Sequence, residues 1–258
     1  MVLALEPEKL GVTVPVIQLC EKSGTKVSVI PFYNDVISTR ATIDNLGAIK
    51  LIQLRTTPLD EPFNAALKRG FDILVSLLGL IVLSPLMLII AVAIKLSSPG
   101  PVLFKQERVG LNKKHFTMLK FRSMKVNDAQ DTAWSKDEDS RRTAVGSILR
   151  KFSLDELPQL FNVLGGDMSL IGPRPEIPFF VEQFRETVPL YMVKNQVRPG
   201  ITGWAQVNGY RGDTSIPKRI EHDIWYIENW SFGLDMKIIF MTVFGGMINR
   251  EVVGQGKA

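Results

Sequence analysis

The feature that most restricts the fold of this chain is an uncharged, strongly apolar run at residues 73–94. A helix rises about 1.5 Å per residue, so a helix over this run would reach across a hydrocarbon core of about 30 Å. Hydropathy alone therefore predicts a simple transmembrane helix.

A proline near the middle of the run argues against a straight crossing. Pro85, in the pair Ser84-Pro85, removes a backbone donor and clashes with the carbonyl of Ile81. We expect the Ser84 hydroxyl to satisfy part of the backbone that the proline frees.

Both ends of the run are basic, whereas a spanning helix should carry its basic residues mainly on one side. Lys68 and Arg69 precede the run, and the basic residues that follow it are Lys95, Lys105, Arg108, Lys113 and Lys114. This pattern predicts a re-entrant helix-break-helix, which enters the membrane, bends at Ser84-Pro85 and returns to the same face. There the flanking charges would meet anionic headgroups.

The remaining sequence predicts three parts. Residues 1–60 are expected to form a partial, small α/β accessory domain, joined by a proline-containing linker at 55–62. Residues 61–98 hold the re-entrant membrane helix. Residues 99–258 are expected to form a mixed α/β, helix-rich domain with many irregular segments.

Short elements are expected in the first and last parts. The predicted strands lie at residues 27–31, 49–54, 102–105 and 116–121, and the predicted helices at 16–22, 147–152 and 155–163. An apolar stretch at 236–248 fits either a core helix or a helix in the membrane interface. The polar segment 127–140 is expected to be a plain surface loop rather than a lid.

Composition and missing motifs exclude several classes of protein. A net charge of +5 favours anionic partners such as phosphates or lipid headgroups. No recognition-helix or stacking-strand pattern appears, so no nucleic acid partner is expected. The single Cys20 precludes an intramolecular disulfide, and His115 and His222 lack zinc-ligand spacing. No P-loop, dinucleotide-binding motif, nucleophile elbow or signal peptide is recognised.

Two adjacent carboxylates, Asp155 and Glu156, are the strongest candidates for chemistry. Ser153 and Glu156 have the spacing of a capping box, and for this pattern alone a helix start is the preferred interpretation. In the alternative interpretation Asp155 attacks phosphorus and forms an acyl phosphate, while Glu156 helps hold Mg²⁺. A helix N-terminus would then keep Asp155 ionised and accept a phosphate nearby.

Basic residues elsewhere supply candidates for phosphate binding. Two prolines flank Arg174 in the segment Gly-Pro-Arg-Pro-Glu, and they preset the direction of a guanidinium that matches phosphate oxygens. Lys120 and Arg122 alternate with apolar residues, as on a strand with a cationic face. Taken alone, each pattern also fits an ordinary strand or a surface arginine.

Taken together and in this order, the segments point to one protein family more specifically than any single segment does. In order they are the basic-flanked apolar helix with Ser84-Pro85, Ser-Pro-Gly-Pro at 98–101, Lys-Phe-Arg at 120–122, Ser-Leu-Asp-Glu-Leu-Pro-Gln at 153–159, Gly-Pro-Arg-Pro-Glu at 172–176 and Pro-Gly-Ile-Thr-Gly-Trp at 199–204. This order closely resembles the bacterial sugar transferase family, the monotopic phosphoglycosyl transferases that begin exopolysaccharide, capsule and O-antigen assembly. The resemblance extends from about Phe63 to near the C-terminus.

The resemblance implies a reaction and a site. Asp155 would take a sugar phosphate from a UDP-sugar and release UMP, and undecaprenyl phosphate would then attack to give the diphosphate-linked sugar. Mg²⁺ is the implied cofactor, with Glu156 as its protein ligand. The implied phosphate-binding residues are Lys120, Arg122, Arg150 and Arg174.

The resemblance also implies a location at the cytoplasmic face of the bacterial inner membrane. Residues 1–60 resemble the end of an α/β domain in long members of the family, whose N-terminal transmembrane helices this sequence lacks. The chain is thus either a naturally short member or a truncated one. Glucose or galactose is the favoured sugar, and the oligomeric state, including a homo-oligomer, stays open.

Two alternatives remain at the level of sequence. A non-catalytic membrane scaffold for polysaccharide enzymes would use the basic surface but would not need the Asp155-Glu156 pair. A lipid-phosphate hydrolase would pass the aspartyl intermediate to water, and it would release UMP without forming a lipid-linked sugar.

Overall fold

The computed structural model describes residues 1–4, 11–23, 25–26, 28–30, 42–46, 49–53, 55–124, 142–212 and 214–245. The chain divides into two compact units, Met1–Thr56 and Thr57–Ala258, and each is described by itself. The predicted surface loop at 127–140 lies outside the described residues.

The described residues of the first unit form two small sheets and one helix. Strand β1 (Val2–Ala4) pairs in parallel with β2 (Ser28–Ile30), and helix α1 (Thr13–Lys22) lies between them in the sequence. Strand β3 (Thr42–Leu46) pairs antiparallel with β4 (Ile49–Gln53). The helix and the two strands predicted in this region are therefore present, with bounds shifted by one to three residues.

The second unit begins with a short helical turn and the membrane helix. Thr57 and Asp60 form a capping box around the 3₁₀ turn η2 (Pro58–Asp60), where the Thr57 amide donates to Asp60 Oδ2 at 2.7 Å. Helix α2 (Pro62–Ser97) then runs for 36 residues, about 54 Å at the usual helical rise. Pro62 occupies the first position of α2, where a missing amide hydrogen removes no helical hydrogen bond.

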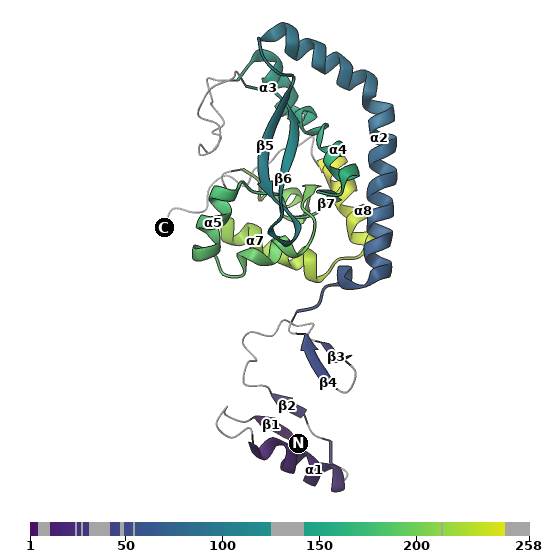
Figure 1. The fold of residues 1–258 in the computed structure, drawn as a ribbon, viewed down its shortest axis with the longest axis vertical. Coiled ribbons are helices and arrows are strands. Elements are labelled where there is room, and N and C mark those ends of the chain that lie inside the picture. Colours follow the sequence, from purple (N-terminus) through teal and green to yellow (C-terminus); the bar gives the residue numbers. More distant parts are fainter. Residues whose placement is uncertain are drawn as a thin grey trace. The chain divides into compact units, whose positions relative to one another are not determined.

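The structure confirms the role predicted for Ser84 and corrects the predicted break. Ser84 Oγ donates to the carbonyl of Ile81 at 2.8 Å, which replaces the hydrogen bond that Pro85 cannot make. Helix α2 is nevertheless continuous across Pro85, and Figure 1 shows one ribbon that bends toward its C-terminal end. Pro85 therefore does not interrupt the helix, and the Ser84 hydroxyl satisfies the carbonyl that the proline frees.

Most of the apolar surface of α2 is exposed. In its most apolar window, only 11% of the residues are buried, and the window is long and apolar enough to cross a membrane. Ile90 and Ile94 on one face are buried against Phe121 and Leu149. The large side chains left exposed on this helix include Leu74, Leu78, Ile81, Val82, Leu88, Ile89 and Val92. A continuous apolar surface of this kind is typical of a membrane-interacting segment.

A long hairpin and a short parallel pair form the sheets of the second unit. Strand β5 (Leu103–Val109) pairs antiparallel with β6 (His115–Phe121) across the turn η3 (Leu111–Lys113). Strand β7 (Ser169–Ile171) pairs in parallel with β8 (Gly200–Thr202). Gly172 and Gly200 lie so close that a Cβ on either would overlap backbone atoms beside the other. Glycine is therefore required where these two segments meet.

Short helices surround these strands. They are α3 (Ala144–Lys151), the 3₁₀ turn η4 (Leu154–Glu156), α4 (Gln159–Gly165), α5 (Pro178–Thr187), the 3₁₀ helix η5 (Tyr191–Gln196), α6 (Trp204–Val207), α7 (Ile216–Glu228), α8 (Phe232–Phe240) and the π-helical turn η6 (Met241–Gly245). Helix α4 contacts both β6 and α2, and Figure 1 shows the hairpin running alongside α2 with α4 between them. The mixed, helix-rich fold predicted for this part of the chain is confirmed.

The apolar stretch predicted at 236–248 is helical as far as residue 245. Ile238 is fully buried in the core with Ile171, Tyr226 and Ile227, whereas Phe240 and Phe244 are more than half exposed. The stretch therefore has a core-facing side, as expected of a core helix, and an exposed apolar side, and its interpretation as a helix in the membrane interface stays a prediction.

A buried ion pair fixes the beginning of α2 to α8. Lys68 Nζ lies 2.7 Å from Asp235 Oδ2, and the side chains are 9% and 1% exposed. The Tyr226 hydroxyl donates to Asp235 Oδ1 at 2.8 Å, and Trp230 Nε1 donates to Oδ2 at 3.1 Å. A buried carboxylate stabilises the fold only when its oxygens are fully satisfied, and these three donors satisfy both.

Replacing Asp235 by alanine is expected to destabilise the protein strongly. The substitution leaves the Lys68 ammonium buried without its carboxylate, and breaking a buried pair in this way costs about 3–5 kcal/mol. For a protein of this size the unfolding midpoint should fall by about 10 °C, measured by circular dichroism in detergent micelles. Glu107→Gln, in the exposed pair with His115, is the control and should shift the midpoint by about 2 °C at most. Equal losses in both variants would contradict a special role for the buried pair.

Candidate functional site

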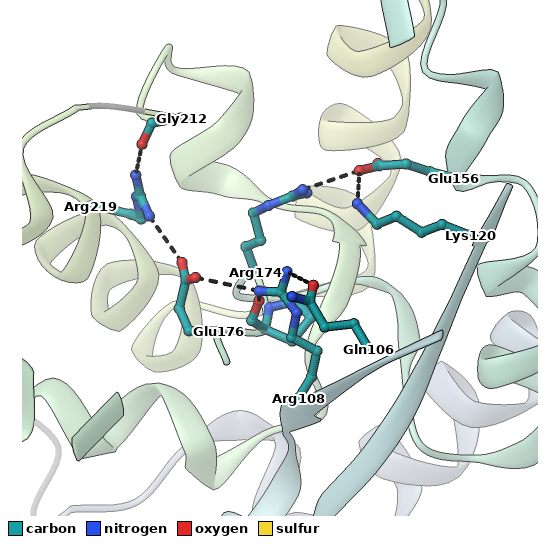
Figure 2. Close-up of polar contacts among 9 residues, drawn as sticks. Gln106, Arg108, Lys120, Glu156, Arg174, Glu176, Gly212 and Arg219 are labelled. Atoms are coloured by element: carbon teal, nitrogen blue, oxygen red, sulfur yellow. Dashed lines mark hydrogen bonds and ion pairs between the residues drawn. The ribbon is translucent and has the colours of Figure 1, made fainter. Parts of the chain in front are cut away.

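Three basic side chains converge on one oxygen of Glu156. Lys120 Nζ lies 2.9 Å from Oε1, Arg174 Nη2 lies 3.1 Å from it, and Arg211 Nη2 lies 3.7 Å from it. Figure 2 shows Lys120 and Arg174 reaching the carboxylate from different segments of the chain. They come from β6, from the loop after β7 and from the loop after α6, so the contact joins three parts of the fold.

Glu156 is held as a carboxylate. It is 7% exposed, and although burial raises its pKa, Lys120, Arg174 and Arg211 together hold the pKa well below the ordinary value. Burial lowers the pKa of Lys120, and the charge of Glu156 opposes that shift. Three cations around one carboxylate leave a local excess of positive charge, which suits the binding of an anion such as a phosphate.

Asp155, the preceding residue, is in a different electrostatic state. It is also 7% exposed, but its pKa is raised, first by burial and second by the charge of Glu156. Lys120 and Arg150 act in the opposite direction without reversing the shift. Neighbouring carboxylates whose pKa values are pushed apart are a frequent feature of catalytic sites.

The local backbone differs from the capping box that the sequence favours. Ser153 has φ 54° and ψ 22°, in the left-handed region, and its side chain makes no capping hydrogen bond. The capping interpretation of Ser153 and Glu156 is therefore wrong. A left-handed serine costs on the order of 1–2 kcal/mol, and such strain is often found at functional sites.

The expectation that a helix N-terminus keeps Asp155 ionised is also wrong. Asp155 lies in η4, a single 3₁₀ turn, and α4 begins only at Gln159. Asp155 therefore does not lie in the first turn of α4, and its pKa is raised by burial and by the charge of Glu156.

Asn162 holds the acidic turn, which is η4 with Asp155 and Glu156, against the hairpin of β5 and β6. Its Oδ1 accepts from the amide of Leu119 at 3.0 Å, and its Nδ2 donates to the carbonyl of Thr117 at 2.8 Å. The side chain thus acts as one more hydrogen-bonding partner along the edge of β6. It fixes α4, and with it Asp155 and Glu156, beside Lys120.

Lys120 and Arg122 do not share the cationic strand face that their alternation predicts. Arg122 is 5% exposed and donates to the carbonyls of Pro99 at 2.7 Å and Ser98 at 2.8 Å. Strand β6 ends at Phe121, so the alternation of side chains no longer applies at residue 122. Arg122 anchors the chain that leaves α2, and it has no contact with Glu156 among the described residues. We therefore leave it out of the proposed phosphate-binding set.

Other residues of the site are absent from the sequence prediction. Arg211 is one, and a second group consists of Arg108, Glu176 and Arg219, which form a buried network beside Arg174. Glu176 was visible in the motif that contains Arg174. Arg211 and Arg219 lie in segments with no recognisable pattern, and only the folded chain brings them to the site.

The carboxylates fit a magnesium ion bound together with a phosphate substrate. Within the described ranges, no group of three or more His, Cys, Asp or Glu side chains could hold a metal. Mg²⁺ in proteins is usually bound by one or two carboxylates together with substrate phosphates and water, so two carboxylates suffice. All three basic groups contact Oε1 of Glu156, and Glu156 is the carboxylate that would hold the ion together with the substrate.

An exposed apolar helix suits contact with a membrane, and three cations around one carboxylate suit the binding of an anion such as a phosphate. Comparison with known proteins identifies the family. The sequence model of the family described as bacterial sugar transferase matches residues 63–249, and the chain belongs to this family.

Curated relatives have similar sequences. The chain is 47% identical over 214 residues to the UDP-glucose:undecaprenyl-phosphate glucose-1-phosphate transferase of Escherichia coli (strain K12), covering 81% of this chain and 46% of that protein. It is 49% identical over 222 residues to the UDP-N-acetylgalactosamine-undecaprenyl-phosphate N-acetylgalactosaminephosphotransferase of Aeromonas hydrophila, covering 83% and 52%. With the exopolysaccharide production protein PSS of Rhizobium leguminosarum bv. phaseoli, identity is 47% over 186 residues, 69% and 93% of the two chains. The chain spans about half the length of the first two relatives.

The two carboxylates should affect stability in opposite directions. Because the pKa of Asp155 is raised, the folded state binds the proton more tightly than the unfolded state, and ionised Asp155 destabilises the fold at neutral pH. Asp155→Asn should therefore raise the unfolding midpoint at pH 7, and this gain should vanish below the ordinary pKa of 3.8, where both states are protonated.

The pKa of Glu156 is lowered, so its stabilising effect is present above the ordinary value of 4.5 and is lost as the pH falls through the folded pKa. Glu156→Gln should lower stability at pH 7 by about 3 kcal/mol, because three basic groups lose their shared carboxylate. Thermal unfolding of both variants between pH 3 and pH 8 measures the two effects. If both variants change the unfolding midpoint in the same direction at pH 7, the opposite pKa shifts assigned to Asp155 and Glu156 are refuted.

Proposed function

We propose that this protein transfers a hexose-1-phosphate from a UDP-sugar to undecaprenyl phosphate, with Asp155 as the nucleophile. The single observation that carries the proposal is the buried Asp155 beside a carboxylate that binds three cations. Excess positive charge attracts the diphosphate of the donor, and the raised pKa of Asp155 makes its ionised form a more basic nucleophile.

In the first step, a carboxylate oxygen of Asp155 attacks the phosphorus that carries the sugar. The bond from that phosphorus to the bridging oxygen breaks, and UMP leaves with the bridging oxygen. In the second step, a phosphate oxygen of the lipid attacks the same phosphorus, and Asp155 leaves as a carboxylate. The product is undecaprenyl-diphosphate-sugar, and a difficult transfer is divided into two easier ones.

The remaining residues of the site bind and orient. Lys120, Arg174 and Arg211 would hold phosphate oxygens of the donor and neutralise charge on the leaving UMP. Arg150, whose charge lowers the pKa of Asp155, would favour the ionised nucleophile. Mg²⁺ held by Glu156 and donor phosphates would supply further charge neutralisation.

The re-entrant arrangement of α2 is part of the same proposal. The bend in α2, the exposed apolar side chains and the basic residues at both ends support a helix that enters and leaves the membrane on its cytoplasmic face. This arrangement would place the site at the level of the lipid phosphate. Protein and membrane would then meet where undecaprenyl phosphate exposes its headgroup.

The names of the relatives support the reaction without fixing the sugar. One relative is a glucose-1-phosphate transferase and another an N-acetylgalactosaminephosphotransferase, at 47% and 49% identity. Nearly equal similarity to both means that overall identity does not select the sugar. The exopolysaccharide named in another relative supports the first membrane step of polysaccharide synthesis as the place of the reaction.

Purified protein in detergent is expected to release UMP from one UDP-sugar in the presence of undecaprenyl phosphate and Mg²⁺. Without the lipid, it should release about one UMP per protein, and its intact mass should rise by one sugar phosphate. Asp155→Asn should lower the steady-state rate by at least about 1,000-fold, as expected for loss of a nucleophile. Chelation of Mg²⁺ should stop the release and its return should restore it.

The exposed Glu186→Gln on α5 is the matched control and should keep the wild-type rate. Full activity in Asp155→Asn would refute the nucleophile. Absence of UMP release by the wild-type protein with every UDP-sugar would favour the scaffold. UMP release without a lipid-linked sugar would favour the hydrolase.

The topology of α2 predicts labelling from one side of the membrane. Phe63 and Leu96, near the two ends of α2, are 76% and 83% exposed, so cysteines placed there should react freely with a reagent. In a Cys20→Ser background, single cysteines at both positions should be labelled in inside-out vesicles and protected in intact spheroplasts. Labelling of the two positions from opposite sides would show that α2 spans the membrane.

A further inference from the structure

Arg219 connects two loops through one guanidinium. It lies on α7, is 4% exposed, and donates from Nη1 to Glu176 Oε1 at 3.0 Å. Its Nη2 donates to the carbonyl of Gly212 at 2.6 Å. Figure 2 shows these contacts on the two sides of the side chain.

Each loop that Arg219 connects carries an arginine of the site. Arg174 precedes Glu176 by two residues, and Arg211 directly precedes Gly212. Gly212 has φ 68°, a conformation that glycine adopts without strain. The two site arginines therefore share one buried support.

A second arginine secures the Glu176 side of the support. Arg108 on β5 donates from Nη1 to the carbonyl of Pro175 at 3.0 Å, and the same nitrogen lies 3.6 Å from Glu176 Oε2. Its Nη2 donates to Gln106 Oε1 at 2.6 Å, and the amide of Val109 donates to the Glu176 carbonyl at 3.0 Å. Both oxygens of the Glu176 carboxylate thus face an arginine, and the backbone around Pro175 is tied to the hairpin.

We propose that Glu176 and Arg219 form a positioning pair, which holds Arg174 and Arg211 at the distance from Glu156 that donor binding requires. This inference rests on the proposed function. Among the described residues, neither member has a hydrogen bond or ion pair with Asp155 or Glu156. The pair acts through the arginines, and its contribution is to fix two loops before the donor arrives, which reduces the cost of ordering them.

Lysine cannot replace Arg219 in this role. The planar guanidinium places two nitrogens toward two separate acceptors, whereas an ammonium is a single point of charge. Arg219→Lys keeps the charge beside Glu176 but gives up the simultaneous contact with Gly212. The variant therefore separates the positioning role from simple neutralisation of Glu176.

A double-mutant cycle with Arg211 tests the proposal. UDP binding to the full chain in detergent is measured by calorimetry for wild type, Arg211→Met, Arg219→Lys and the double variant. We expect each single variant to bind about tenfold more weakly, and the double variant to bind no more than about threefold more weakly than Arg211→Met. Once Arg211 is gone, the support of its loop no longer matters for binding.

Arg198→Lys is the matched control, because Arg198 also holds a carbonyl, that of Gly166, but supports neither arginine loop. Its effect should add to that of Arg211→Met. An additive, about 100-fold loss for Arg211→Met with Arg219→Lys would overturn the positioning role. If the wild type binds UDP but releases no UMP, the proposed function is refuted. The double-mutant cycle of UDP binding would then still test whether Glu176 and Arg219 position the two arginines. Absence of UDP binding by wild type would overturn both.

Discussion

The negative charge of Glu156 is the constraint on which the site depends. A carboxylate that is 8% exposed on its side chain needs compensation, and here the compensation comes from Lys120, Arg174 and Arg211. Because these residues come from three separate segments, one buried charge draws the hairpin and two loops to the same point. The arrangement overcompensates the carboxylate, so the site that results is selective for anions.

A second buried carboxylate, Asp235, likewise joins separate segments, in this case helix α2 and the rest of the second unit. With Lys68, Tyr226 and Trp230 it forms a directional contact near the beginning of α2, in addition to the apolar packing of the helix. The exposed apolar side of α2 can then face lipid while its beginning stays fixed.

Features that depend on local sequence patterns could be predicted, whereas features that depend on contacts between distant residues could not. Hydrophobic periodicity located β6 to within one residue, but the helix predicted at 155–163 begins only at Gln159. The expectation that Ser84 satisfies backbone freed by Pro85 is confirmed by its contact with the Ile81 carbonyl. Arg211 could not be predicted, because its approach to Glu156 depends on how the loop after α6 folds back. Arg122 shows the opposite error, since a regular alternation was extended one residue beyond the end of its strand.

The backbone of the acidic turn explains why the capping-box pattern of Ser153 and Glu156 gave a wrong prediction. A helix start at Ser153 would have placed both carboxylates in a first helical turn, near its free amides. The left-handed Ser153 and the single 3₁₀ turn instead direct Glu156 toward the cations, while Asp155 stays buried with a raised pKa. Adjacent residues of the same chemical type thus acquire opposite properties. The charge of Glu156 thus has two effects, since it draws the three cations together and it helps to raise the pKa of its neighbour Asp155.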